Sequence, residues 1–220
     1  FDPEVMTDLS KDLRAMLRER CVVRQLELEQ FQTSAVSGTR KALYRLRDGE
    51  VVESVLLRHH DRMTLCLSTQ VGCPIGCAFC ATGQAGFIRD LAPGEIVEQA
   101  LHLLADEDLD GRTPNIVYMG MGEPFLNYDA MAKSIQLLMM KDGLGIGARK
   151  ITVSTVGIVP GIVRFSQEDW QVRLSVSLHA ADDELRSRLV PVNRKYPLHE
   201  LRSALERYQG ESGRQFTFEW

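Results

Sequence analysis

Three cysteines in a short loop constrain this chain more than any other feature of its sequence. Cys73, Cys77 and Cys80 form a C-x3-C-x2-C pattern, written out as Cys73-Pro-Ile-Gly-Cys77-Ala-Phe-Cys80. Thiolates at this spacing can hold one cubane cluster from a single loop. Because a cubane contains four irons, three cysteines leave one iron without a protein ligand. That open iron can bind a small molecule.

A small molecule with an amino group and a carboxylate suits the open iron. S-adenosylmethionine (SAM) presents both groups, and electron transfer from the cluster into its sulfonium breaks a carbon–sulfur bond to give a 5′-deoxyadenosyl radical. We therefore predict a 4Fe-4S cluster at Cys73, Cys77 and Cys80, with SAM as the second cofactor. A zinc site and a set of core cysteines remain the alternatives, although structural zinc usually takes four ligands and no cysteine follows Cys80.

The number of cysteines separates this chain from secreted disulfide proteins. The chain has five cysteines, and four of them, from Cys66 to Cys80, lie within fifteen residues. Small secreted domains usually spread an even number through the chain, so an odd, clustered set favours metal ligation or redox chemistry. No apolar run reaches the roughly 18 residues of a membrane span, and no signal peptide is recognised. We expect a cytoplasmic protein that does not enter a membrane.

The overall charge excludes binding of nucleic acid through bulk charge alone. The net charge is −4 over 220 residues, which still allows local basic patches. The stretches 11–24 and 186–195 are candidates for such patches. Each can equally be the solvated face of a helix.

Strand-like and helix-like segments alternate from residue 63 onward. This alternation predicts an α/β fold, with parallel strands, helices packed outside them and chemistry at the carboxyl ends of the strands. The expected strands are 63–68, 115–121, 150–156, 172–178 and 215–220, and the expected helices are 93–109, 128–140, 161–167, 183–190 and 198–208.

The chain before this core divides into two parts. Residues 2–32 have apolar residues at helical spacing, so 1–38 is predicted as an N-terminal helical segment. The turn signal Asp48-Gly49 lies between two apolar runs, so 39–62 is predicted as a β-hairpin extension. The core is then 63–220.

Polar residues at the predicted strand ends are candidates for holding SAM. Gly122 lets a ligand approach the backbone and Glu123 can accept hydrogen bonds from an ammonium group, while Ser154, Ser177 and His179 can hold the carboxylate and the ribose. Phe79 either covers the cluster, reaches the adenine or is a plain core aromatic. Each of these residues taken alone is as readily a cap, a turn or a satisfied core group.

Seven segments together resemble one family, the RlmN/Cfr family of radical SAM RNA methyltransferases. The resemblance runs in order from about residue 39 to 220 and is nearer to the RlmN type. The segments are Cys66-Leu-Ser-Thr-Gln-Val-Gly-Cys73, the loop from Cys73 to Cys80, Gln84-Ala-Gly-Phe87, Gly120-Met-Gly-Glu-Pro124, Ser154-Thr-Val-Gly157, Ser177-Leu-His-Ala180 and Val190-Pro-Val-Asn-Arg-Lys-Tyr196.

The resemblance implies a fold and a reaction. The fold is a partial (β/α)6 TIM-like radical SAM barrel, here truncated after about the fifth strand. The reaction methylates carbon 2 of an adenosine in 23S rRNA, at the peptidyl-transferase centre, and also in the anticodon loop of tRNA. It passes through a methyl-cysteine and a protein–RNA adduct. A flavodoxin-type electron donor and a monomeric enzyme are implied as well.

The resemblance also assigns roles to residues. It makes Cys73, Cys77 and Cys80 the cluster ligands, Cys66 the resolving cysteine and Glu53 an acidic residue that handles a proton. It places Gly122, Glu123, Ser154, Ser177, Leu178 and His179 in contact with SAM. Without the resemblance, Cys66 reads as a thiol inside a strand and Glu53 as a polar strand residue.

One departure from the family pattern stands out. The family's methylated cysteine lies beyond the fifth strand, and this chain has no cysteine after Cys80. We expect that the sequence is a fragment, since it begins at Phe1 and stops at Trp220 inside a strand-like run. Two other functions remain open: a radical SAM enzyme of another class, which would not need Cys66, and methylation at carbon 8 of adenine as in Cfr. A non-catalytic zinc or iron–sulfur module is the alternative outside enzymes.

Overall fold

One mixed sheet of eight strands organises the molecule. The structure is a computed structural model that describes residues 3–21, 24–59, 62–109 and 111–220. The strand order is β1-β2-β3-β4-β7-β8-β9-β10. The first four strands pair antiparallel, and β4, β7, β8, β9 and β10 pair parallel.

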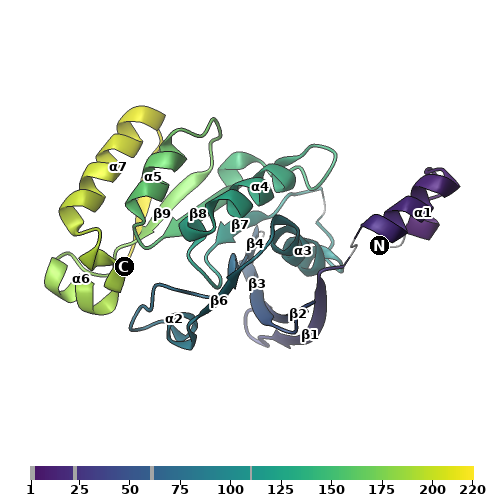
Figure 1. The fold of residues 1–220 in the computed structure, drawn as a ribbon, viewed down its shortest axis with the longest axis horizontal. Helices are drawn as coiled ribbons and strands as arrows, with labels where there is room; N and C mark the ends of the chain where they lie inside the picture. The colour runs from purple at the N-terminus through teal and green to yellow at the C-terminus, as the bar shows by residue number, and fades with distance from the viewer. Residues whose placement is uncertain (1–2, 22–23, 60–61, 110) are drawn as a thin grey trace.

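The parallel half follows the predicted alternation of strands and helices. Helices cover one face of its strands, with α3 packed against α4 and α5 against α7 (Figure 1). The α/β fold class is therefore confirmed. The strands are β4 (Arg62–Cys66), β7 (Asn115–Tyr118), β8 (Ile151–Thr155), β9 (Arg173–Ser177) and β10 (Phe216–Glu219), and the helices are α3 (Pro93–Leu104), α4 (Tyr128–Met139), α5 (Val159–Ser166), α6 (Asp183–Leu189) and α7 (Leu198–Ser212).

The two faces of the parallel strands differ in chemistry because successive side chains alternate. Val153, Leu174 and Val176 are fully or almost fully buried in the hydrophobic core. The residues between them are polar: Ser154 lies opposite Ser175 in the ladder, and Ser177 lies opposite Glu219. One face thus joins the core under the helices, and the other presents hydroxyls and a carboxylate.

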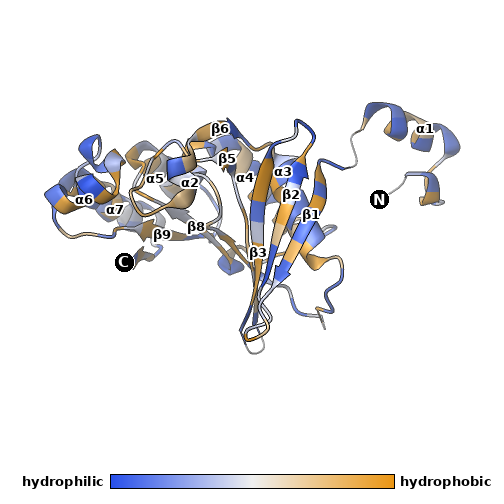
Figure 2. Ribbon diagram, turned by 90° about the horizontal axis from the view of Figure 1, so that it is seen from below, coloured by the Kyte–Doolittle hydropathy of each residue, from blue (hydrophilic) through white to orange (hydrophobic). Residues whose placement is uncertain are grey.

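The antiparallel half consists of β1 (Leu26–Thr33), β2 (Arg40–Leu46) and β3 (Val51–His59). The turn at Asp48-Gly49 joins β2 to β3 as the turn signal predicts. Hydrophobic and hydrophilic residues alternate along these strands (Figure 2). Because β3 pairs with β4, this extension and the core share one continuous sheet. The predicted boundaries at residues 38 and 62 stay predictions.

The prediction of a helix over residues 2–32 is wrong for its second half. Residues 26–33 form β1, and the helix α1 is limited to Lys11–Arg20. Leu26 and Leu28 follow the period of a strand, and ladder hydrogen bonds to β2 outweigh local helical spacing. Residues 1–2 and 22–23 of the prediction lie outside the described residues. Helix α1 buries none of its residues and lies apart from the sheet (Figure 1).

Short elements complete the fold. In the described part of the chain, β5 and β6 form a separate two-stranded sheet. Within the described residues, no helix has both the length and the hydropathy that crossing a bilayer requires. The remaining elements are β5 (Gln70–Gly72), α2 (Ala81–Ala85), β6 (Phe87–Asp90) and the 3-10 turns η1 (Pro3–Val5), η2 (Pro124–Leu126), η3 (Ala148–Lys150) and η4 (Pro191–Arg194).

Candidate functional site

The cysteine loop connects β5 to α2 and is fixed at its base by β6. Gly72 pairs with Phe87 in the two-stranded sheet, and the Cys73 N–H donates to the Gly86 carbonyl at 2.8 Å. Gly72 has φ 75°, and a Cβ there would clash with the Gly86 carbonyl oxygen. Only glycine satisfies both conditions. Cys73, the first ligand of the predicted cluster, therefore directly follows a rigidly held strand end.

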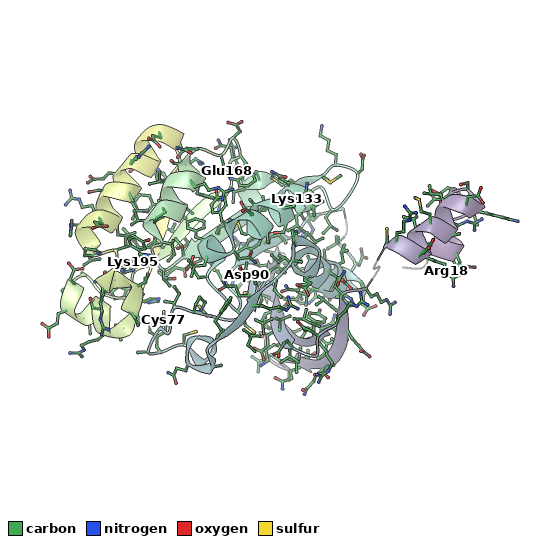
Figure 3. All side chains as sticks on the ribbon, viewed as in Figure 1. Arg18, Cys77, Asp90, Lys133, Glu168 and Lys195 are labelled. Atoms are coloured by element: carbon green, nitrogen blue, oxygen red, sulfur yellow. The ribbon has the colours of Figure 1, made fainter. Side chains whose placement is uncertain are left out.

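The far side of the loop rests on the end of helix α6. The Ala78 N–H donates to the Leu189 carbonyl at 2.9 Å, and the Cys80 N–H donates to the Cys77 carbonyl at 3.1 Å. Figure 3 shows Cys77 on the loop that passes between α6 and α2. Cys77 is buried, while Cys73 and Cys80 are half-buried. The loop is thus held from both sides with its thiols turned toward the molecule.

All three thiols line one cavity of about 210 Å³ at the carboxyl ends of the parallel strands. This is where an α/β fold of this kind collects its chemistry. Most of the residues that the sequence singled out also lie around this cavity. They are Phe79, Gly122, Glu123, Ser154, Ser177 and His179, joined by Thr82, Met119, Thr155 and Glu219.

The three thiols border one volume, as the ligands of a multi-iron cluster do. Among the residues that the structure describes, no three His, Cys, Asp or Glu side chains are arranged to hold one metal ion. A cubane takes one thiolate per iron, so its ligands surround a volume and do not converge on a point. Burial raises the pKa of Cys73 to about 11 and that of Cys77 to about 12. These raised pKa values favour the neutral thiols, and bound iron would supply the positive charge that stabilises the thiolates.

Glu123 is a buried residue in the turn that follows β7. It is 2% exposed; its Oε1 accepts from the Phe125 N–H at 3.0 Å and its Oε2 from the Val156 N–H at 2.9 Å. Burial raises its pKa to about 7 despite these bonds. Gly122 before it has φ 101°, and a Cβ there would lie 2.6 Å from the Gln70 side chain. The turn has no room for any residue but glycine.

The ends of β8 and β9 bring three more predicted residues together. The hydroxyls of Ser154 and Ser177 lie 3.3 Å apart. The ring of His179 meets the ring of Phe79 edge-on, with centroids 4.5 Å apart. His179 has φ 58°, an uncommon conformation for a residue with a side chain. Its pKa is lowered by burial and by the nearby Arg186 charge.

Three predicted site residues lie outside the lining of this cavity. Leu178 donates its N–H to the Glu219 carbonyl at 2.9 Å, so its backbone braces the strand end. Cys66 ends β4, and burial raises its pKa to about 11. Glu53 lies on β3, where its carboxylate pairs with Lys41 at 2.8 Å. Val55, two residues after Glu53, lies opposite Cys66, so Glu53 and Cys66 share a face of the sheet.

Two features of the site are absent from the sequence-based prediction. Glu219 lines the cavity and accepts from the Ser175 hydroxyl at 2.8 Å. The alternation of Thr217 and Glu219 in a terminal strand is the signal that could have found it. Arg186, assigned above to a basic patch or a solvated helix face, is instead fully buried.

Comparisons with known proteins agree with this geometry. Residues 67–217 match the radical SAM superfamily. The crystal structure of a radical SAM methyltransferase from Sphaerobacter thermophilus has 48% identical residues and a TM-score of 0.94, covering 100% of this chain and 64% of that one.

Curated relatives share the same range of identity. The relative from Pseudothermotoga lettingae is 46% identical over 99% of this chain and 63% of its own length. The relative from Heliobacterium modesticaldum is 49% identical over 98% of this chain and 58% of its own length. Both are named "Probable dual-specificity RNA methyltransferase RlmN", and the chain spans about three-fifths of their length. A 4Fe-4S cluster and SAM are the cofactors of the superfamily, and by its matched residues the chain belongs to the radical SAM superfamily.

Proposed function

We propose that the protein is an RNA methyltransferase of the RlmN type. Its substrate is carbon 2 of an adenosine in 23S rRNA, at the peptidyl-transferase centre, and in the anticodon loop of tRNA. The observation that carries the proposal is the single cavity that gathers Cys73, Cys77, Cys80 and Glu123 at the strand ends. The names of the relatives support RNA as the substrate class.

Different residues of the cavity bind the cluster and SAM. When bound, the cluster and SAM would supply the one-electron cleavage of a carbon–sulfur bond, which yields a radical. Cys73, Cys77 and Cys80 hold the cluster. Glu123 accepts hydrogen bonds from the ammonium group of SAM. A buried carboxylate binds a cation more strongly than a carboxylate exposed to water does.

The strand ends hold the other groups of SAM. The hydroxyls of Ser154 and Ser177 face the same space and hold the carboxylate and ribose. Phe79 is 54% exposed at the mouth and covers the adenine side, with His179 against its ring. The backbone of Leu178, outside the cavity lining, braces the strand end that carries Ser177.

Cys66 and Glu53 serve the later steps of the proposed reaction. Carbon 2 of adenine is a poor nucleophile, so the methyl group first resides on a cysteine of the protein. Cys66 then attacks the sulfur of that cysteine as a thiolate. The disulfide forms as the carbon–sulfur bond of the protein–RNA adduct breaks, and the released carbon takes up a proton to become the methyl group. Cys66 is free and half-buried, and its high pKa keeps it a thiol until a base removes its proton. Glu53, on the same face of the sheet, is the group that handles a proton.

The proposed setting follows from the same chemistry. A flavodoxin-type protein donates electrons to the cluster, the enzyme acts as a monomer, and the reaction takes place in the cytoplasm, where thiols stay reduced. The target base must leave its stack to enter the mouth of the cavity.

Methylation of defined RNAs by the full-length, cluster-loaded protein tests this function. Fragments of 23S rRNA and an intact tRNA are incubated with SAM and a reductant, and the modified nucleoside is identified by mass spectrometry and comparison with standards. The expected product is 2-methyladenosine. Methylation at carbon 8 would assign the Cfr reaction instead, and 5′-deoxyadenosine without any methylated RNA would assign another radical SAM reaction.

A further inference from the structure

Arg186 is a charged residue that the proposed chemistry does not use, yet it is fully buried. Its exposed fraction is 0%, and it lies on α6 beside the cavity without lining it. A buried charge is costly unless its hydrogen-bonding capacity is met. The guanidinium meets this condition almost entirely with backbone carbonyls. A residue placed at such cost has a task that a surface arginine could not perform.

The carbonyls bound by Arg186 lie at the ends of β8 and β9: Val156 follows β8, Ser177 is the last residue of β9 and Leu178 follows it. Its Nη2 donates to the Val156 carbonyl at 2.6 Å and to the Ser177 carbonyl at 3.3 Å. Its Nε donates to the Leu178 carbonyl at 3.0 Å. One planar fork thus joins two neighbouring strand ends, a geometry that only arginine provides.

These carbonyls lie directly behind groups that face the cavity. The Val156 carbonyl accepts from Arg186, and the N–H of the same residue donates to Glu123 Oε2 at 2.9 Å. On the next strand, Ser177 lines the cavity, and His179 holds its unusual φ of 58° immediately after the bound carbonyl of Leu178. Moving the guanidinium would release both turns at once.

The guanidinium is itself held by Asn193. Nη1 donates to the Asn193 Oδ1 at 2.7 Å, and the amide of Asn193 donates to Asp183 at 2.8 Å and to Ser187 at 2.9 Å. Asn193 is 1% exposed. These bonds give a physical role to the segment 190–196, which the sequence singled out without one.

The same helix also supports the cysteine loop. Leu189, three residues after Arg186, accepts the Ala78 N–H of that loop. Arg186 thereby connects the turns after β8 and β9 with the helix that carries the loop.

We propose that Arg186, held by Asn193, is a positioning residue that fixes the turns after β8 and β9 in the conformation that binds SAM. It acts through Val156 on Glu123 and through Leu178 on His179, and it does not touch the ligand. The inference rests on the proposed function of the cavity as the SAM site.

The chain offers a matched control for general destabilisation. Arg214 is another buried arginine, 8% exposed, whose guanidinium donates to the carbonyls of Phe165 at 2.8 Å and Trp170 at 2.9 Å. These carbonyls lie near the amino-terminal end of β9, away from the cavity. Arg188 on α6 is exposed and controls for loss of charge on the same helix.

The experiment compares equilibrium SAM binding by cluster-loaded wild type, R186M, R186K, R214M and R188M. Iron content, melting temperature and hydrogen exchange at Val156, Leu178 and His179 are measured on the same samples. R186M is expected to weaken SAM binding about tenfold or more, because it removes the charged hydrogen bonds that fix both turns. It is also expected to accelerate exchange at these amides. R186K recovers part of the affinity.

The controls decide between positioning and mere stability. R214M lowers the melting temperature as much as R186M but leaves SAM affinity within about twofold, and R188M changes neither. If R186M is poorly folded, Asn193→Ala keeps the guanidinium and is expected to weaken binding about threefold. Equal SAM affinities in R186M and wild type, or equal losses in R186M and R214M, would overturn the inference alone. A wild type that binds no SAM would overturn the proposed function with it.

Discussion

Phe79 and His179 form an edge-to-face pair, with ring centroids 4.5 Å apart, that closes the cysteine loop against the turn after β9. Such a pair contributes about 0.5–1.5 kcal/mol. Because Phe79 is 54% exposed, its removal should affect the cavity mouth more than the core.

Phe79→Ala is therefore expected to weaken SAM binding by about 2- to 10-fold with little change in melting temperature. Equilibrium binding to the cluster-loaded protein measures this. Phe87, which is 44% exposed and outside the cavity lining, is the control: Phe87→Ala should bind SAM normally. Equal effects of the two variants would remove Phe79 from the site.

The raised pKa of Glu123 predicts a pH-dependent stability of the metal-free protein. The carboxyl has a pKa of about 7 in the folded state against 4.5 in its ordinary state, so folding favours its neutral form. The contribution of this carboxyl to the free energy of unfolding is fully present below pH 4.5 and is lost as the pH rises through 7. This loss amounts to roughly 3 kcal/mol.

Urea unfolding at pH 5 and pH 8 measures the effect. Wild type should lose more unfolding free energy between these values than Glu123→Gln, whose side chain does not ionise. Parallel losses in the two proteins would show that the Glu123 carboxyl titrates normally.

Gly122 and Gly145 provide a matched pair of left-handed glycines. Gly122 has φ 101° and no room for a Cβ beside Gln70, whereas Gly145 has φ 60° and open space. Gly122→Ala should cost about 3 kcal/mol of unfolding free energy, from backbone strain and overpacking together, and Gly145→Ala about 1 kcal/mol. Chemical denaturation of both variants tests this. Similar costs would mean that the turn before Glu123 can relax.

Cys66 should be dispensable for SAM cleavage but needed for release of RNA. In the full-length protein, Cys66→Ala is expected to bind the cluster, form 5′-deoxyadenosine and then accumulate a covalent protein–RNA adduct. Gel electrophoresis of labelled RNA under denaturing conditions detects such an adduct. Cys21→Ala is the control, because Cys21 is exposed and distant in the sequence from the loop. Normal release of methylated RNA by the Cys66 variant would contradict the proposed resolving role.

The sequence predicts long elements well because each shows its own period. Helix α4 and strands β8 and β9 start and end within one residue of the expected bounds, whereas α3 ends five residues before the expected 109. Strands β5 and β6 have three and four residues and lack an apolar run like that of β7, so the sequence predicts neither of them. The apolar spacing of 2–32 favours a helix, yet β1 forms there because β2 offers a partner for its backbone.

Some residues of the site are also predictable from the sequence, and others are not. Three cysteines at close spacing and a glycine before Glu123 leave a local signature. Arg186 does not, because the charge pattern of α6 is that of a solvated helix and only the fold turns this one arginine inward. The alternation of Thr217 and Glu219 places Glu219 on a polar strand face, but only the pairing of β10 with β9 brings it to the cavity.

Radical SAM chemistry requires that the cavity hold a cluster that cleaves SAM. Anaerobic reconstitution of wild type and Cys77→Ala with iron and sulfide, followed by reduction with dithionite in the presence of SAM, tests it most directly. Wild type is expected to form 5′-deoxyadenosine, and Cys77→Ala is expected to form none. A wild type that binds zinc, takes up no cluster and forms no 5′-deoxyadenosine would contradict the account.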